Sequence, residues 1–243
     1  MRGQARYIKA AHLNRFPRLP ARIIRELARA NVKDTNILVV GSHALYAYEA
    51  EAGVQIESGL LATLDLDILW DTRSTLKISA NLAKKGLMKI LRKADSSFEP
   101  LRKGSFRASN SEGFMVDLIK PEPRPPWKQD ATTMGNADDL WATPLRNLDW
   151  LRDAPKFRTI VMDQDGFPLH ISVPDPRAFS LHKIWVSCQP DRNPQKAPRD
   201  LDQAKAVAQM TSKFLPQFPM EGELLRHIPW IHAKTLPQIP EGF

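Results

Sequence analysis

The segment from residue 64 to residue 69 alternates apolar and acidic side chains in the order Leu-Asp-Leu-Asp-Ile-Leu. A period of two is typical of a β-strand with one buried face. We therefore expect Leu64, Leu66 and Ile68 to lie on one face of the strand, and Asp65 and Asp67 to project together from the other face. The sequence thus predicts a sheet that carries two carboxylates pointing the same way.

A strand–turn–helix unit precedes this acidic strand. Residues 35–40 (Thr-Asn-Ile-Leu-Val-Val) indicate a buried strand that ends at Gly41. We expect Ser42 to N-cap a helix that runs to Gly53, the glycine expected at its end. A Gly-Ser turn at a helix N-terminus offers backbone N–H groups, a hydroxyl and the positive end of the helix dipole, which together suit a triphosphate.

A third carboxylate belongs to a predicted pair of strands between residues 98 and 120, joined by a turn at 110–113. Asp117 is the only charge in the apolar run 114–119. A buried carboxylate needs a partner or a metal ion. Three carboxylates on neighbouring strands can hold two Mg²⁺ ions for phosphoryl transfer, although each alone has an ordinary explanation as a polar face or a salt bridge.

The remaining pattern gives the organisation of the chain. Helices are predicted over 21–30, over 76–94 with an interruption at Gly86, and over 176–188, 199–211 and 221–231. A Pro-rich loop spans 121–135, and a hairpin is predicted at 157–162 and 169–173. We expect a basic N-terminal helical segment (1–34), an α/β unit of the α+β type (35–125), a Pro-rich connection with the hairpin (126–174) and a mainly helical C-terminal lobe (175–243).

Charged residues are unevenly distributed. Residues 1–40 carry nine Lys or Arg against two acids, residues 41–71 carry none against six, and residues 72–107 carry ten against two. Solvated helix faces explain any single block. The whole pattern suits a carboxylate–metal centre flanked by surfaces that attract polyanions.

Composition excludes several classes of protein. With 42% hydrophobic and 26% charged residues, the 243-residue chain is not disordered as a whole. A single cysteine, Cys188, excludes a disulfide framework and a Cys-rich metal site, which suits a reducing compartment, so we expect a cytoplasmic protein. Its apolar runs are far shorter than the roughly 20 residues of a membrane helix, so we expect no membrane span.

Taken together, these motifs resemble the G-S, D-x-D and D signature of the nucleotidyltransferase superfamily, whose palm is like that of DNA polymerase β. The likeness extends to a bacterial family of uncharacterised nucleotidyltransferases, through four stretches of sequence. These are residues 41–49 (GSHALYAYE), 63–67 (TLDLD), 113–121 (GFMVDLIKP) and 176–183 (PRAFSLHK). The 22 residues between Ser42 and Asp65 are roughly twice the gap usual in the superfamily.

The resemblance implies a mixed sheet flanked by helices, with a helical lobe after it. It places Mg²⁺ or Mn²⁺ on Asp65 and Asp67, with Asp117 completing the metal and catalytic site, and it places an NTP with its phosphates on Gly41 and Ser42. Related nucleotidyltransferase toxins of abortive-infection systems add two candidate nucleotide-binding residues. These are Lys183 and, in the run Arg-Asp-Leu-Asp-Gln at 199–203, Asp200.

The implied reaction moves NMP from an NTP to an acceptor hydroxyl and releases pyrophosphate. A net charge of +8 and the exposed position expected for Trp127 favour a nucleic-acid acceptor such as RNA or tRNA. Trp141, Trp150 and Trp185 are expected to pack in the core. Two alternatives stay open at this point: a silent nucleotide- or RNA-binding protein with the same palm, and a structural module whose acids are salt-bridged. The NTP, the acceptor, a role as a toxin and the oligomeric state are not fixed by the sequence.

Overall fold

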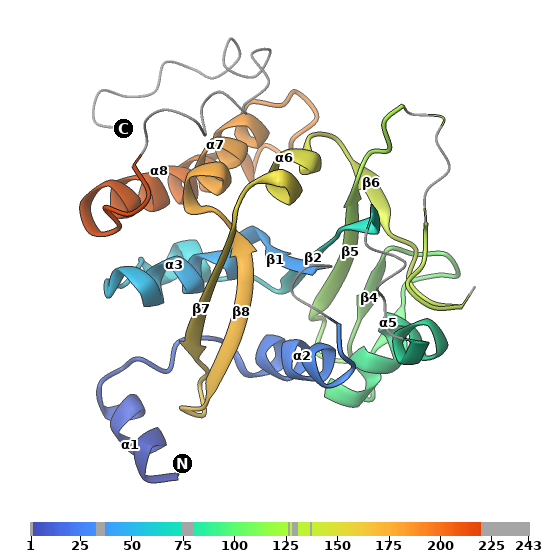
Figure 1. The fold of residues 1–243 in the computed structure, drawn as a ribbon, viewed down its shortest axis with the longest axis horizontal. Helices are drawn as coiled ribbons and strands as arrows, with labels where there is room; N and C mark the ends of the chain where they lie inside the picture. Colours follow the sequence, from blue (N-terminus) through green and yellow to red (C-terminus); the bar gives the residue numbers. More distant parts are fainter. Residues whose placement is uncertain are drawn as a thin grey trace.

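The computed structural model describes residues 2–32, 37–73, 80–125, 127, 131–136 and 138–219. It contains a mixed sheet of six strands and a separate two-stranded sheet, with helices packed around them (Figure 1). The predicted fold class, an α+β arrangement of a mixed sheet flanked by helices, is therefore confirmed.

The order of the strands brings distant parts of the chain together. The main path is β1 (Ile37–Val40), β2 (Asp65–Trp70), β5 (Met115–Pro121), β4 (Arg107–Ser109) and β3 (Glu99–Pro100). Off this path, β6 (Thr143–Leu145) pairs in parallel with the last three residues of β5. Strands β2 and β5 are parallel, and Asp67 is the register partner of Asp117. Strand β4 is antiparallel to β5, and Arg107 is the other register partner of Asp117.

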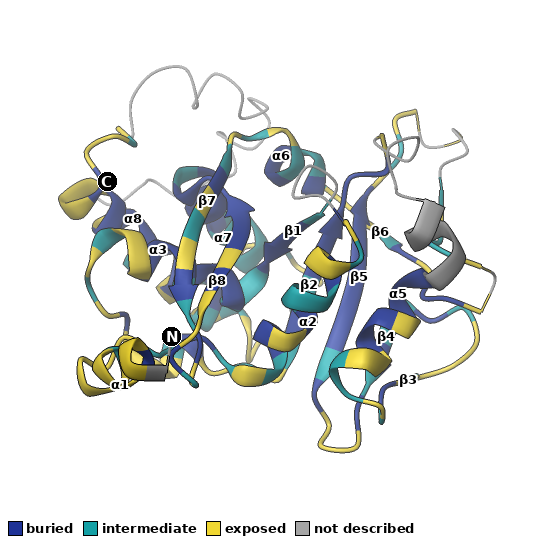
Figure 2. Cartoon of the chain, turned by 60° about the horizontal axis from the view of Figure 1, so that its bottom comes forward, coloured by how far each residue is buried: buried dark blue, intermediate teal, exposed yellow. Residues whose placement is uncertain are grey.

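The alternation in β2 separates the two faces of the sheet. Leu66 and Ile68 are fully buried in the main core, which they share with α2 (Arg18–Arg29) and α5 (Ala80–Ala94). These two helices lie side by side on that face, and Figure 2 shows their outer sides exposed. A smaller cluster on the other face packs against α6 (Leu148–Asp153) and α7 (Pro176–Ser187). Leu64 was predicted on the same face of the strand as Leu66 and Ile68, but it lies before the first residue of β2 and is 66% exposed.

Most predicted elements are confirmed. The strands around the turn at 110–113 are β4 and β5, and the hairpin is β7 (Lys156–Met162) with β8 (Pro168–Pro174). Helix α5 is kinked at Gly86, which has φ of 66°. The helices at 176–188 and 199–211 correspond to α7 and α8 (Ala197–Phe214). The predicted helix at 221–231, residues 76–79 of another helix and residues 35–36 of the first strand lie outside the described residues.

The long gap between Ser42 and Asp65 is filled by η1 (Gly41–Ala44), α3 (Leu45–Ala52) and α4 (Ser58–Leu61). Ser42 was expected to cap a helix, and this was wrong: the chain already turns into η1 at Gly41, so Ser42 lies inside the turn and its hydroxyl is bonded elsewhere. Gly53 does end α3 in the left-handed conformation, with φ of 66°, as predicted.

Three tryptophans test the packing expected from the sequence. Trp150 is buried and Trp127 is 83% exposed, as predicted. Trp141 is 43% exposed, which corrects the expectation that it packs in the core; its ring lies over Gly104 on the surface. None of the helices in the described ranges is both long and apolar enough to cross a membrane.

Candidate active site

All seven site residues predicted from the sequence line one cavity of about 980 Å³. One side of this cavity, the sheet wall, is formed by Asp65, Asp67, Arg107 and Asp117, with the turn at Gly41 and Ser42 beside it. The opposite side, the helical wall, comes from α7, α8 and the segment between them. Its polar residues are Lys183, Arg192, Lys196, Arg199, Asp200 and Gln203.

Gly41 allows the turn to lie directly against the acidic strand. Its φ of 66° is in the left-handed region, and a Cβ atom on this residue would overlap Oδ2 of Asp67. Only glycine satisfies both conditions. The backbone of the turn therefore lies directly against the Asp67 carboxylate. A residue with a side chain at position 41 would not permit this contact.

The Ser42 hydroxyl is held by the last described helix. Nε2 of Gln203 donates to Ser42 Oγ at 2.9 Å and also to the carbonyl oxygen of Leu60 at 2.7 Å. The Arg199 guanidinium donates to the carbonyl oxygens of Leu60 and Ala62 and lies 3.5 Å from Ser42 Oγ. Because Ser42 Oγ accepts from Gln203, its own proton is available for another acceptor in the cavity.

The middle carboxylate is the one whose protonation is most perturbed. The pKa of Asp67 is raised to about 7, chiefly by burial and then by the negative charges of Asp65 and Asp117. The pKa of Asp65 lies below its ordinary value: burial alone would raise it, but the hydrogen bond from Thr63 and the charge of Lys196 outweigh burial. This mutual repulsion acts because the three carboxylates line the same part of the cavity.

Asp117 is paired with an arginine that sequence reasoning did not single out. Nε and one terminal nitrogen of Arg107 donate to the two carboxylate oxygens of Asp117 at 2.6 and 2.5 Å. Asp117 is 5% exposed, whereas the side chain of Arg107 is 29% exposed and lines the cavity. The requirement that a buried carboxylate has a partner is thus met by Arg107.

The sequence held only part of the signal for this pair. The predicted turn at 110–113 is centred between residues 111 and 112, so a symmetric hairpin would pair residue 107 with Val116. The observed register is centred on residue 112, which places Arg107 opposite Asp117 on the same face of the sheet. Because the two registers differ by one residue, the turn alone did not identify Arg107 as the partner of Asp117.

The helical wall is organised around one buried acid. Asp200, 3% exposed, accepts from Nζ of Lys183 at 2.6 Å and from Arg192 at 2.5 and 2.6 Å. Its side chain therefore binds two cations instead of capping α8, in whose first turn it lies. Lys196 Nζ reaches across the cavity to within 3.7 Å of Asp65 Oδ2. Neither Arg192 nor Lys196 was predicted, because the segment between two helices carries no periodic pattern.

The fit of the acidic residues to a metal ion follows from the donors and their surroundings. Over the described ranges, no three His, Cys, Asp or Glu side chains converge tightly enough to hold a metal ion as they stand. Carboxylate oxygens are nevertheless the donors that Mg²⁺ and Mn²⁺ prefer. Two side-chain cations, from Arg107 and Lys196, already lie against this acidic cluster. The donor set therefore fits a divalent cation that replaces those two groups.

His43 lies behind the site and is fully buried among the rings of Phe16, Tyr46 and Phe114. Burial lowers its pKa to about 4, against the attraction of Asp65. At neutral pH the imidazole is therefore uncharged, and it contributes packing to the back of the acidic strand rather than a positive charge.

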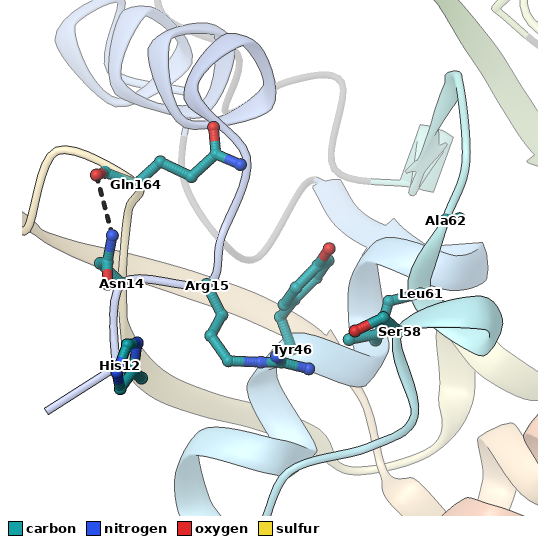
Figure 3. Close-up of a pocket in the computed structure, with 8 residues that line it drawn as sticks. All are labelled: His12, Asn14, Arg15, Tyr46, Ser58, Leu61, Ala62 and Gln164. Carbon is teal, nitrogen blue, oxygen red and sulfur yellow. Dashed lines mark hydrogen bonds between the residues drawn. The ribbon is translucent and has the colours of Figure 1, made fainter. Parts of the chain in front are cut away.

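A second, smaller pocket of about 350 Å³ shares Ala62 with the main cavity. Its guanidinium, from Arg15, is neutralised by both carboxylate oxygens of Glu49, at 2.5 and 3.1 Å. Figure 3 shows the residues of this pocket, with Asn14 donating to the backbone oxygen of Gln164. None of the residues predicted for the active site lies in this pocket.

One comparison with known proteins identifies the family of the chain. A family model described as nucleotidyltransferase matches residues 18–227, a range that includes all seven predicted site residues. The chain belongs to this nucleotidyltransferase family. Neither the curated proteins nor the solved structures contain a match to the chain. As a nucleotidyltransferase, the protein belongs to the transferases, and the predicted superfamily is confirmed.

Proposed function

We propose that this nucleotidyltransferase moves NMP from an NTP to an acceptor hydroxyl in a reaction that depends on Mg²⁺ or Mn²⁺. The observation that carries the proposal is the single cavity in which the turn at Gly41 and three carboxylates face the cations of the helical wall. Acids alone would suit a metal ion, and cations alone would suit a polyanion. Their opposition across one cavity suits a metal-bound triphosphate.

Each residue then has a role that its contacts support. Asp65 and Asp67, with Asp117, would hold the divalent ion, which when bound neutralises the phosphates and the leaving pyrophosphate. The Gly41 turn lies against Asp67 and would place its backbone N–H groups on the phosphates. The Ser42 hydroxyl, fixed by Gln203, would donate its proton to a phosphate oxygen.

The helical wall would bind the far end of the triphosphate. Lys183 and Arg192 are held side by side by Asp200, so both are positioned before the nucleotide arrives. We therefore assign Asp200 the positioning of these cations, with no direct contact to the nucleotide. Fixed cations at the leaving group lower the barrier because little reorganisation is needed during the reaction.

The proposed transfer exchanges one phosphorus–oxygen bond for another. The acceptor oxygen forms a bond to the α-phosphorus, and the bond from the α-phosphorus to the bridging oxygen of the β-phosphate breaks. The electron pair of that bond leaves with pyrophosphate, opposite the acceptor oxygen. The proton of the acceptor hydroxyl passes to the carboxylate of Asp117, which must first be released by Arg107.

The experiment is incubation of the full chain with each α-³²P-labelled NTP, Mg²⁺ or Mn²⁺, and total cellular RNA. Label should enter RNA with the native protein and not with the double variant Asp65→Asn, Asp67→Asn. Asp165→Asn is the matched control, because this carboxylate is 40% exposed and pairs with Arg18 away from the cavity. Label on protein or in a small product would keep the chemistry and replace RNA as the acceptor.

The alternative is a silent nucleotide-binding protein, and one observation favours it: the third carboxylate is closed by Arg107. This alternative predicts that the native protein binds NTP but transfers no label to any acceptor. The structural-module alternative predicts neither binding nor transfer, although the three acids already line one cavity. A role as a toxin related to the abortive-infection enzymes would require that transfer to RNA also arrests growth.

A further inference from the structure

The sheet wall continues past Asp117 into an apolar surface. Phe106, Ile119 and Leu145, from β4, β5 and β6 or their edges, line this part of the cavity together with Met115 and Thr143. Leu145 is 41% exposed and Phe106 is partly exposed, so the surface is accessible. The proposed reaction needs a second substrate, and this is the part of the cavity that the proposed triphosphate site does not use.

Arg107 stands at the edge of this apolar surface. The guanidinium carbon of Arg107 lies 5.5 Å from the centroid of the Phe106 ring. Two nitrogens of the same guanidinium donate hydrogen bonds to the two carboxylate oxygens of Asp117. The same donor fork fits a phosphate as well as a carboxylate. A phosphate-binding cation beside an accessible aromatic ring is the combination that recognises a nucleotide unit, because the ring stacks on the base and the cation binds the phosphate.

The strand order assigns this surface to the acceptor and not to the NTP. Across the sheet, the turn after β1 comes first, then Asp67 on β2, then Asp117 on β5, and then Arg107 on β4. The carboxylates therefore separate Arg107 from the turn at Gly41. A triphosphate that lies between that turn and the helical wall leaves Arg107 on the opposite side of the reacting atoms.

We propose that Arg107 and Phe106 form an acceptor subsite for a nucleotide unit, and that the acceptor phosphate draws Arg107 away from Asp117. This inference rests on the proposed function. Without acceptor, Arg107 occupies both oxygens of the Asp117 carboxylate. With acceptor, the guanidinium moves to the phosphate and Asp117 becomes available. The enzyme would thereby be assembled only when both substrates are present, which protects the NTP from hydrolysis by water.

The test measures metal binding and acceptor binding directly. Mn²⁺ is titrated into the full-length native protein and followed by electron paramagnetic resonance, with and without a short oligoribonucleotide that ends in a 3′-hydroxyl. We expect the oligoribonucleotide to tighten Mn²⁺ binding about tenfold, within the usual range of coupling between linked sites. By the same linkage, Mn²⁺ should tighten oligoribonucleotide binding by the same factor.

Substitution of Arg107 should remove this coupling. In Arg107→Gln, Mn²⁺ should bind about tenfold more tightly without RNA, because no cation competes for Asp117, and the oligoribonucleotide should bind about tenfold more weakly. Arg107→Lys keeps a positive charge beside Asp117, so this variant should fold. It lacks the paired N–H donors of the guanidinium, so it should lose most of the coupling between Mn²⁺ binding and oligoribonucleotide binding. Arg29→Gln, on the other face of the sheet and 71% exposed, is the matched control and should behave as the native protein.

Several outcomes would overturn the inference. Native protein without coupling between Mn²⁺ and oligoribonucleotide would do so even if Arg107→Gln failed to fold. Weaker binding of a non-hydrolysable NTP by Arg107→Lys, with unchanged oligoribonucleotide binding, would instead assign Arg107 to the NTP. A titration with free nucleoside monophosphate in place of the oligoribonucleotide distinguishes a small acceptor from an RNA end, and coupling with either supports the subsite.

Failure of this inference is distinguishable from failure of the proposed function. If label transfer depends on Asp65 and Asp67 while the Arg107 variants keep native binding and coupling, only the acceptor subsite is wrong. If the native protein transfers no label although Mn²⁺ and oligoribonucleotide binding are coupled through Arg107, the subsite stands and the transfer reaction is wrong.

Discussion

On the helical wall, the cations are held by a buried acid, whereas on the sheet wall the acids are held by partly exposed cations. Asp200 is almost fully buried and binds Lys183 and Arg192 together. Asp117 is also buried, but its partner Arg107 reaches the cavity, and Asp65 is approached by the exposed Lys196, which extends from the helical wall. The comparison teaches that, in the proposed reaction, the cations of the helical wall would already be in place for a polyanion, whereas the acids of the sheet wall would first exchange the cations beside them for a metal ion.

The largest expected effect comes from breaking the helical wall. Asp200→Asn removes the charge that holds two mostly buried cations, and loss of one partner from a buried ion pair typically costs roughly 3–5 kcal/mol. We expect the free energy of unfolding to fall by about this amount in urea denaturation, and NTP affinity to fall with it.

Asp202→Asn is the matched control for that change, because Asp202 lies on the same helix with an exposed side chain. It should change the unfolding free energy by less than about 0.5 kcal/mol. Equal destabilisation by the two variants would show that Asp200 has no special role in the helical wall.

The next effect tests the contact between the turn and the sheet wall. Gly41→Ala places a methyl group on Asp67 in a left-handed backbone, and we expect about 3 kcal/mol of destabilisation from strain and overlap together. Gly53→Ala has the same φ but open space around its Cβ, so it should cost only about 1 kcal/mol.

Thermal or urea unfolding of both glycine variants measures this difference. Label transfer should be lost in Gly41→Ala and retained in Gly53→Ala, because only the first displaces Asp67. Equal losses in the two variants would mean that backbone strain alone matters and that the close approach to Asp67 does not.

A pH dependence of stability should arise from behind the sheet wall. The pKa of His43 is about 4 in the folded protein and about 6.5 when unfolded. Between these values the unfolded chain binds the extra proton, so this residue lowers stability progressively as the pH falls from about 6.5 to 4. At pH 5 the loss should be about 2 kcal/mol relative to pH 7.5.

Urea denaturation of the native protein and of His43→Phe at pH 7.5 and 5 isolates this contribution. The Phe variant keeps an aromatic ring among Phe16, Tyr46 and Phe114. Between the two pH values the native protein should lose about 2 kcal/mol more stability than this variant, because the raised pKa of Asp67 acts in the opposite sense in both proteins. The charge of Asp65 acts on the His43 imidazole, so the Asp65→Asn variant is measured at the same two pH values to separate that effect from burial. Identical pH profiles of stability for the native protein and His43→Phe would show that the pKa of His43 does not contribute to this pH dependence.

The smallest effect should come from Lys196, the exposed cation that extends from the helical wall to Asp65. Lys196 is 57% exposed and 3.7 Å from Asp65, and such pairs contribute about 0–1 kcal/mol. Lys196→Gln should therefore leave the unfolding free energy nearly unchanged and slightly tighten Mn²⁺ binding. If Lys196→Gln lowered the free energy of unfolding as much as Asp200→Asn does, the proposed difference between the buried and the exposed ion pairs would be wrong.

The sequence was informative where a local pattern decides the structure. The alternation in β2 predicted both the strand and the shared direction of Asp65 and Asp67, and the turn at 110–113 predicted the strand that carries Asp117. Two glycines were also predicted correctly: Gly53 ends α3, and Gly86 interrupts α5.

The sequence was less informative where long-range contacts decide. Ser42 follows the rules for a helix cap, but Gln203, far away along the chain, binds its hydroxyl instead. Arg192 and Lys196 lie in an irregular segment, and only the packing of α7 against α8 brings them to the cavity. The candidate roles of the seven predicted residues stay predictions until the experiments above are done.

The bonds from Gln203 to Ser42 and Leu60 join positions that are 161 and 143 residues apart in the chain. During synthesis the N-terminal part of the protein leaves the ribosome first. The turn, the acidic strand and the third carboxylate would therefore all be made before the helix that fixes the Ser42 hydroxyl. A growing chain would carry an incomplete active site until α8 emerges and docks, so activity would begin only once nearly the whole described protein has folded.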